Sequence, residues 1–381
     1  MSNQQIFFPG LNSVRCLAVT LVIFTHIESF KQKSGLQSLL NNDSLKDFIG
    51  GLGRQGVIIF FTLSGFLITY LLLVEKKTIL TIEIKKFYIR RILRIWPLYF
   101  TIVILGFFIL PHILSPDYFA VKPTPHLLQK LLLTIFFLPN AVLIIYGSIF
   151  SIGVLWSIGV EEQFYLFWPH FIKRFKLSQL FKAFTVLLIA LVTLKTGLWL
   201  ILNSIIPIPS LYGISKLLYQ FLHYDSMLIG AFCALIYFNK TLNKVLYTTF
   251  VQLMVIVFIL LFWANSNIFG PFANTVASIL YGILILNIST NRNTLIKGTP
   301  MFEYVGKISY GMYLFHSIAI AFFLRLFGHF TSLTNLQFNF LLYILVFGST
   351  ILISALSYTF FEKPILNYKK RYMVVQSSNS K

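Results

Sequence analysis

Long runs of apolar residues, separated by short polar stretches, dominate this chain. Each run is close to the length of about 20 residues that an α-helix needs to cross the hydrocarbon core of a bilayer. Candidate spans lie at residues 11–30, 56–74, 97–114, 127–147, 155–172, 183–203, 217–238, 245–264, 272–290, 304–326 and 338–360. The pattern therefore predicts an all-α protein built as a polytopic transmembrane helical bundle.

Lysine and arginine are concentrated in particular loops between these candidate spans. Basic stretches occur at 75–96, 173–182, 239–244, 291–307 and in the tail after Glu362. Because basic residues collect in cytoplasmic loops, we expect these stretches and both termini to be cytoplasmic. The loops that would then lie outside are 31–55, 111–126, 204–216, 265–271 and 327–337.

This assignment gives the region 127–172 one candidate span too many, because the region starts outside and ends inside. One of its segments should be re-entrant or broken, which is tolerated where protein shields the backbone. Pro139, Asn140 and the glycine-containing stretch 147–153 favour a break. We expect about ten crossings plus one re-entrant or broken segment. Residues 1–365 would form the membrane domain, and residues 366–381 a short basic cytoplasmic tail.

The composition excludes several classes of protein. Hydrophobic residues make up 57% of the chain and charged residues 11%, whereas a soluble domain carries about 25% charged residues. A soluble enzyme, a disordered protein and a nucleic-acid binder are thereby excluded, and the lipid bilayer is the expected surrounding. The net charge of +20 is explained by cytoplasmic loops, by a basic site for a phosphorylated ligand, or by both. Cys16 and Cys233 provide neither a disulfide framework nor a zinc-binding spacing, so we expect no metal site.

Polar side chains inside candidate spans are costly and therefore point to function. Arg15 and His26 lie eleven residues apart, close to three helical turns, so they share one face of the first helix. The alternative is an arginine that reaches the membrane surface and a hydrogen-bonded histidine in the core. Asp225 and His316 also fall near mid-membrane depth, where they either contact a substrate or join helices by hydrogen bonds.

A cluster of arginines stands at the expected cytoplasmic end of a span. Arg91 and Arg94 are one helical turn apart and face the same way, and Arg90 precedes them. Guanidinium groups bind phosphates with two parallel hydrogen bonds, so the cluster suits a phosphorylated ligand. An equally good explanation is an anchor on anionic lipid.

Two adjacent carboxylates, Glu161 and Glu162, begin an apolar segment shortly after Trp156. Adjacent positions point about 100° apart on a helix, so the two carboxylates need different partners. Arg15 and His26 are the candidate partners. The alternative is a favourable interaction of acidic residues with a helix N-terminus.

Taken together and in order, these motifs resemble the acyltransferase family 3 proteins, which are integral-membrane acyltransferases. The resemblance is carried by residues 11–15 with His26, by 56–67, by 90–99, by 156–165, and by 308–316 with the later Glu362-Lys363-Pro364. The chain departs from the family pattern at Asn12 and Ser13, where Asp-Gly is usual, at Gly159, where Ser is usual, and at His223. The resemblance covers about 350 residues, and we identify the chain as a member of this family.

The resemblance implies an O-acyltransferase that moves an acyl group, by default acetyl, from cytoplasmic acyl-CoA to a hydroxyl of an extracytoplasmic or lipid-linked glycan in a bacterial inner or plasma membrane. A neutral His26 would take the hydroxyl proton, with Glu161 or Glu162 orienting its ring. Arg15 or Tyr310 would steady the oxyanion. The resemblance further implies acyl-CoA binding by Arg90, Arg91 and Arg94, and acceptor binding by Asp225, His316 and Trp156.

Two other functions fit a chain with buried charges and about ten crossings. One is a transporter or flippase for a glycan precursor, and the other is a non-catalytic partner in exopolysaccharide assembly. Neither requires a basic entrance of the size of CoA beside a histidine. Binding of acyl-CoA therefore separates the enzyme from both alternatives.

Overall fold

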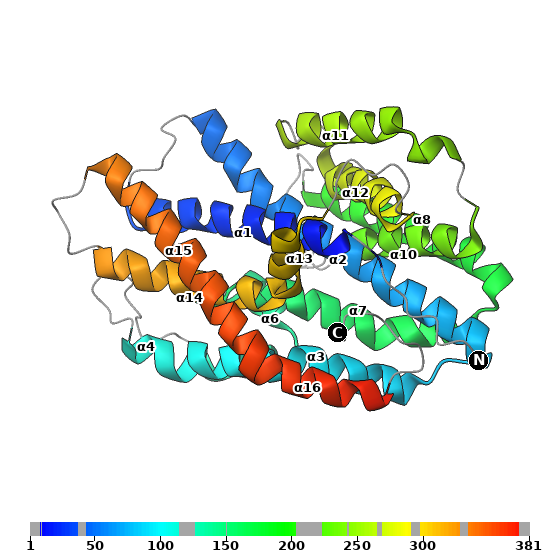
Figure 1. Ribbon diagram of the computed structural model, residues 1–381, viewed down its shortest axis with the longest axis horizontal. Helices are drawn as coiled ribbons and strands as arrows, with labels where there is room; N and C mark the ends of the chain where they lie inside the picture. The colour runs from blue at the N-terminus through cyan, green and yellow to red at the C-terminus, as the bar shows by residue number, and fades with distance from the viewer. Residues whose placement is uncertain are drawn as a thin grey trace.

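A computed structural model describes residues 8, 10–36, 43–113, 126–149, 151–202, 223–241, 244–264, 269–290, 298–327 and 334–372 (Figure 1). Within these ranges the regular structure is helical, as predicted. The α-helices are α1 (Leu11–Lys33), α2 (Asp43–Ile79), α3 (Ile84–Ile104), α4 (Leu110–Ile113), α5 (Leu127–Ile135), α6 (Pro139–Ile145), α7 (Leu155–Arg174), α8 (Leu180–Leu202), α10 (Tyr224–Asn239), α11 (Thr249–Ala264), α12 (Ala273–Thr290), α13 (Pro300–Lys307), α14 (Ser309–Phe327), α15 (Asn335–Ser357) and α16 (Lys363–Lys369).

In the described part of the chain, seven helices are long and apolar enough to cross a membrane. They are Leu11–Lys33, Phe48–Ile79, Ile84–Ile113, Leu177–Leu202, Gly270–Thr290, Ser309–Phe327 and Asn335–Lys369, and the shorter apolar helices α10 and α11 accompany them. The all-α membrane bundle is thus confirmed. The number of ten crossings, the side of each loop and the cytoplasmic termini stay predictions. Of the predicted tail, residues 373–381 lie outside the described residues.

The predicted break lies within the first segment of the region 127–172. Helix α5 ends at Ile135 and α6 begins with Pro139, whose missing N–H and fixed ring suit the first turn of a new helix. The carbonyl of Phe137, in the intervening turn, accepts a hydrogen bond of 2.8 Å from Gln163 of α7. Protein therefore satisfies the exposed backbone of the break, while α7 continues through its own Pro169.

The basic stretch 75–96, expected as a loop, is largely helical. Helix α2 continues to Ile79, and α3 already begins at Ile84. An ion pair of 2.9 Å between Glu75 and Arg90, almost fully withdrawn from solvent, ties the two helices together. The expected span 304–326 is likewise divided into α13 and α14. Apolar runs mark the bilayer-sized part of a helix, and its amphipathic ends extend beyond them.

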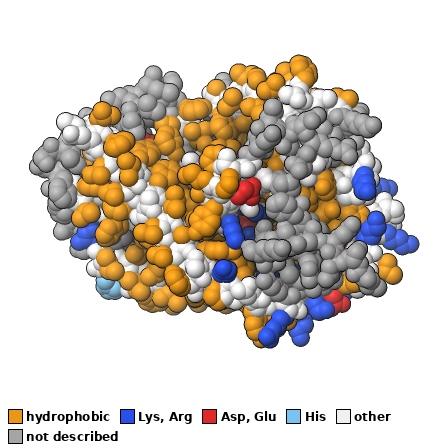
Figure 2. All heavy atoms as spheres, viewed as in Figure 1, with side chains coloured by type: hydrophobic (Ala, Val, Ile, Leu, Met, Phe, Trp, Pro, Cys, Tyr) orange, Lys and Arg blue, Asp and Glu red, His pale blue; other side chains and the backbone are white. Residues whose placement is uncertain are grey.

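Helix α2 lies at the centre of the bundle, and Gly65 of α2 and Gly230 of α10 allow these two helices to pack very closely. In the apolar window of α2, 67% of residues are buried, against 11% for α8, which therefore lies at the periphery. A Cβ at Gly65 would fall 1.9 Å from the carbonyl oxygen of Met227, and one at Gly230 would fall 2.0 Å from that of Thr62. Small residues at helix contacts are typical of membrane bundles. Hydrophobic side chains cover much of the surface shown in Figure 2.

Candidate active site

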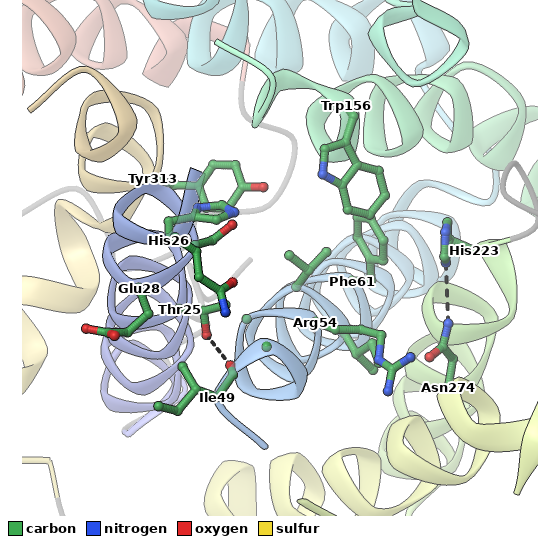
Figure 3. A pocket seen from close by; sticks show the side chains of 16 residues that line it. Thr25, His26, Glu28, Ile49, Arg54, Phe61, Trp156, His223, Asn274 and Tyr313 are labelled. Carbon is green, nitrogen blue, oxygen red and sulfur yellow. Dashed lines mark hydrogen bonds between the residues drawn. The ribbon is translucent and has the colours of Figure 1, made fainter. Parts of the chain in front are cut away.

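Two cavities lie inside the bundle, and both are bordered by α1, α2, α7 and α14. We call the first, of about 450 Å³, the histidine cavity, because His26 and His223 line it (Figure 3). We call the second, of about 180 Å³, the arginine cavity, because Arg15, Arg91 and Arg94 line it. Arg15 and His26, eleven residues apart on α1, therefore line different cavities.

The histidine cavity combines aromatic and polar side chains. The ring of Trp156 on α7 lies 5.4 Å from that of His223, measured between centroids, and Asn274 of α12 lies within 3.5 Å of the imidazole of His223. In Figure 3, His26 lies on one side of this space, with Trp156 and His223 on the other. Glu28 also lines the cavity, but its carboxylate is paired with Lys31 at 2.6 Å.

The ring of His26 is fixed by a second histidine. His26 Nδ1 and His316 Nε2 lie 2.7 Å apart, and the two rings are nearly coplanar, with an angle of 3° between them. His316 is fully buried, and its Nδ1 lies 3.2 Å from the carbonyl oxygen of Met312.

Hydrogen-bond chemistry assigns the proton positions in this pair. A carbonyl oxygen only accepts, so His316 Nδ1 carries a proton and donates it to Met312. In a neutral His316 the Nε2 atom is then an acceptor, and His26 Nδ1 must donate to it. The proton of a neutral His26 is thereby held on Nδ1, and the lone pair is on Nε2. This is the tautomer that a general base requires.

The arginine cavity brings together most of the predicted charged residues. Arg15, Arg91 and Arg94 line it, and so do Glu161 of α7 and Tyr310 of α14. These side chains come from four helices, so tertiary packing creates the group. Basic side chains outnumber the single carboxylate in the lining, which makes the cavity suitable for an anion.

Arg15 is held by a relay that ends in a carboxylate. Its Nη1 donates to Asn12 Oδ1 at 2.7 Å, and Asn12 Nδ2 donates to Glu303 Oε2 at 3.0 Å. Ser13 also donates to Glu303, at 3.3 Å. Residues 12 and 13, which depart from the family pattern, therefore connect α1 to α13. The backbones approach closely here, because a Cβ at Gly306 would lie 1.9 Å from the carbonyl oxygen of Asn12.

Arg91 is oriented by aromatic rings. Its guanidinium lies 5.6 Å from the ring centroid of Phe87 and 5.7 Å from that of Tyr165. Its buried Nε has no hydrogen-bond partner among the described residues. Cation–π contacts fix the plane of a guanidinium and leave its N–H groups available to a ligand.

The two cavities share one wall. Val57 and Phe61 of α2 and Tyr313 of α14 line both of them. The hydroxyl of Tyr313 lies 2.7 Å from Ser157 Oγ, and its ring centroid lies 5.8 Å from that of His316. A molecule that reaches from the arginine cavity to His26 must therefore pass these three side chains.

The structure corrects one expectation about how His26 is oriented. His316 takes the position at Nδ1 that we had assigned to Glu161 or Glu162. Glu161 instead accepts a hydrogen bond of 3.1 Å from Tyr165, and Glu162 accepts one of 3.0 Å from Trp96. His316, in turn, is buried behind His26 and does not line the cavity, where we had expected an acceptor contact.

Three more predicted site residues have structural partners. Arg90 binds Glu75 and donates to the carbonyl of Tyr372 at 2.9 Å, so it does not line the arginine cavity with its neighbours. Asp225 forms a buried ion pair of 2.8 Å with Lys195 of α8. Trp156 does line the histidine cavity, as expected, and Tyr310 donates to the carbonyl of Ile95 at 2.8 Å.

Sequence reasoning missed four residues that line the arginine cavity: Ser64, Tyr165, Tyr313 and Lys369. Tyr313 lies three residues from His316, within a motif already singled out, and that proximity was the available signal. Tyr165 hydrogen-bonds both Glu161 and Ser64. Nothing in the sequence indicated Lys369, because the C-terminal residues read as a polar tail.

Comparison with known proteins gives a consistent family assignment. A family profile described as an acyltransferase domain matches residues 8–359. A candidate O-acetyltransferase of Staphylococcus aureus is 26% identical over 403 residues, which cover 96% of this chain and 60% of that protein. The peptidoglycan O-acetyltransferase of Listeria monocytogenes is 29% identical over 177 residues, which cover 44% of this chain and 25% of the relative.

A candidate peptidoglycan O-acetyltransferase of Bacillus subtilis is 29% identical over 178 residues, covering 44% of this chain and 24% of the relative. The chain thus spans about 60% of the length of the Staphylococcus relatives that it matches. No solved structure matches it. Since the family profile covers nearly the whole chain and the ordered motifs lie within it, the protein belongs to acyltransferase family 3.

Proposed function

We propose that this protein is a membrane O-acetyltransferase that moves an acetyl group from acetyl-CoA to a hydroxyl of a cell-envelope glycan. The observation that carries the proposal is the pair of adjoining cavities. One is lined by three arginines and the other by a histidine with a free Nε2 lone pair, and a single wall of three side chains separates them. Each cavity suits one of the two substrates.

The arginine cavity suits the donor. CoA carries several phosphate charges, and Arg15, Arg91 and Arg94 face the same space. Arg15 is close to the N-terminal end of α1, so the predicted topology places this cavity toward the cytoplasm, where acyl-CoA is made. The pantetheine arm is thin and flexible, so it suits passage along the wall while the phosphates stay among the arginines.

The histidine cavity suits the acceptor. Its volume of about 450 Å³ is within the range of about 300–1,000 Å³ that is usual for small-molecule sites. Trp156 offers an aromatic face, and Asn274 and Gln32 offer hydrogen-bonding groups. Such a lining suits a sugar. The Listeria relative is named a peptidoglycan O-acetyltransferase, so envelope glycans are the first acceptors to test.

The transfer follows from the assigned tautomer. The acceptor hydroxyl gives its proton to His26 Nε2 while its oxygen attacks the thioester carbon. The tetrahedral intermediate then collapses, the carbon–sulfur bond breaks, and the leaving thiolate takes the proton back from His26. Throughout, the proton stays on His26 Nδ1 and donates a hydrogen bond to His316 Nε2, so His316 acts as a positioning residue.

A positively charged or hydroxyl group is needed near the developing oxyanion. We had assigned this role to Arg15 or Tyr310, and both line the arginine cavity. Tyr313 is a third candidate, because it lines both cavities and lies beside His316. Its hydroxyl would have to turn from Ser157 toward the substrate.

Glycan mass spectrometry on a host strain tests the proposal. Wild type, a deletion strain, and deletion strains complemented with wild-type, His26→Ala or His112→Ala protein are compared at matched membrane levels. His112 is an exposed histidine of α4 and serves as the control. We expect the acetyl mass on the glycan to be lost in the deletion and in His26→Ala only.

Two outcomes would overturn the proposal. If His26→Ala inserts, folds and restores full acetylation, then His26 is not the base. If the deletion leaves acetylation unchanged but alters export of the glycan, then the protein is a transporter. Transfer by purified wild-type protein supplied with labelled acetyl-CoA and the identified glycan, and loss of that transfer in His26→Ala, would make the assignment of donor and acceptor direct.

A further inference from the structure

The C-terminal helix contributes a cation to the arginine cavity. Lys369, the last residue of α16, lines the cavity together with Arg15, Arg91 and Arg94. Arg90, the third arginine of α3, is instead paired with Glu75. Lys369 therefore adds a fourth basic side chain to a cavity lined by one carboxylate.

Contacts of α16 with α15 and α3 fix the position of Lys369. A π-helical turn at Tyr358–Glu362 joins α15 to α16, and Figure 1 shows α16 lying along α3. Arg90 of α3 donates to the carbonyl of Tyr372, just beyond the end of α16. These contacts hold α16 against α3, and the side chain of Lys369 reaches the cavity from there.

Four cations in one small cavity repel one another unless an anion lies between them. Glu161 is the one carboxylate among the residues that line the cavity. Glu303, at the end of the Arg15 relay, and Glu162 and Glu362 lie outside that lining. The buried Nε of Arg91, without a partner among the described residues, also points to a missing acceptor.

We propose that Lys369, delivered by the C-terminal helix α16, is a binding residue for the phosphate groups of the acyl-CoA donor. This inference rests on the proposed function. It assigns to α16 a part in donor recognition. Lysine acts here as a point charge beside the bidentate arginines.

The experiment measures binding of coenzyme A and of pantetheine to purified, membrane-reconstituted protein. The variants are Lys369→Ala, Lys369→Arg and the control Lys363→Ala, an exposed lysine of the same helix. We expect Lys369→Ala to weaken coenzyme A binding about tenfold, because one charge-assisted interaction is lost. Lys369→Arg should bind almost as wild type, and Lys363→Ala should bind as wild type.

Two further readouts separate a binding role from a structural one. Pantetheine lacks phosphate, so Lys369→Ala should leave its affinity unchanged. The variant should also reduce the dependence of coenzyme A affinity on salt, since one fewer cation takes part. Without ligand, its melting temperature should be equal or higher, because removal of Lys369 relieves repulsion among like charges.

The inference is overturned if Lys369→Ala binds coenzyme A as tightly as wild type while Arg91→Ala binds it weakly. It is also overturned if Lys369→Ala lowers the affinity for both probes equally, or lowers the melting temperature of the unliganded protein. If wild-type protein does not bind coenzyme A, the proposed donor is wrong and this inference fails with it. Binding of coenzyme A by the wild-type protein therefore distinguishes the two failures.

Discussion

The contact between His26 and His316 makes a prediction about catalysis rather than stability alone. Changing His316 to Ala removes the acceptor of His26 Nδ1, which lies 2.7 Å away in a fully buried setting. An unsatisfied buried donor costs about 1–3 kcal/mol, and the proton of His26 can then move to Nε2, where it blocks the base. General-base catalysis contributes about 10²–10⁴-fold, so we expect kcat to fall by about 10²-fold.

The geometry also predicts that this variant changes kcat and not the KM for the donor. His316 lies behind His26 and outside the arginine cavity, so the KM for acetyl-CoA should change little. Gln at position 316 can place an amide oxygen near the position of the imidazole Nε2. We therefore expect His316→Gln to recover a large part of kcat, and His316→Leu to recover none. The assay is release of free CoA from acetyl-CoA in the presence of the acceptor.

A neighbouring variant provides the control for stability. Ser317 is buried on the same helix, and its hydroxyl donates to the carbonyl of Ser151. Ser317→Ala should lower the melting temperature without lowering kcat. The reasoning about the tautomer would be refuted if His316→Ala kept wild-type kcat. It would equally be refuted if the Gln, Leu and Ala variants all lost activity in proportion to their loss of folded protein.

Two further pairs of variants distinguish a structural role from a binding role or test the packing. Arg90→Ala should lower the free energy of unfolding by about 3 kcal/mol, because Glu75 is left buried without its partner. Arg91→Ala should instead raise the KM for acetyl-CoA about tenfold or more. Thermal unfolding and donor titration measure the two effects, and the reverse pattern would contradict the assignment of the arginine cavity. Gly65→Ala should abolish accumulation of folded protein, since its Cβ would lie 1.9 Å from a carbonyl oxygen of α10, whereas Gly348→Ala, with open space around it, should accumulate as wild type; equal levels by fluorescence-detected chromatography would contradict this packing.

The helical class was predictable because the bilayer requires long apolar segments, and those segments are visible in the sequence. The helix ends were less predictable. The stretch 75–96 is polar enough to suggest a loop, yet the buried pair of Glu75 and Arg90 holds it as the end of one helix and the start of the next. Pro139 correctly indicated a break, because proline lacks the N–H that would bond to the preceding turn and so suits the start of a new helix. Pro97 and Pro169, which lie inside α3 and α7, show that a proline alone does not fix a helix end.

Several residues of the candidate site were predictable from the sequence, but the contacts between them were less predictable. Helical spacing shows that Arg15 and His26 share a face of α1, but it does not show which helix packs against each end of that face. Packing of α14 beside α1 brings His316, and not a glutamate, to His26. Lys369 depends on a π-helical turn and on the docking of α16, which hydrophobic patterning does not report.

The spacing along α1 gives one helix a residue in each cavity, Arg15 in one and His26 in the other. Eleven residues at 1.5 Å per residue separate Arg15 and His26 by about 16 Å, which is a distance that an extended pantetheine arm can bridge. Val57, Phe61 and Tyr313 stand between the two cavities. The proposed function therefore separates donor binding and chemistry in space, and it predicts that substitutions among the arginines act on KM while those at the histidine pair act on kcat.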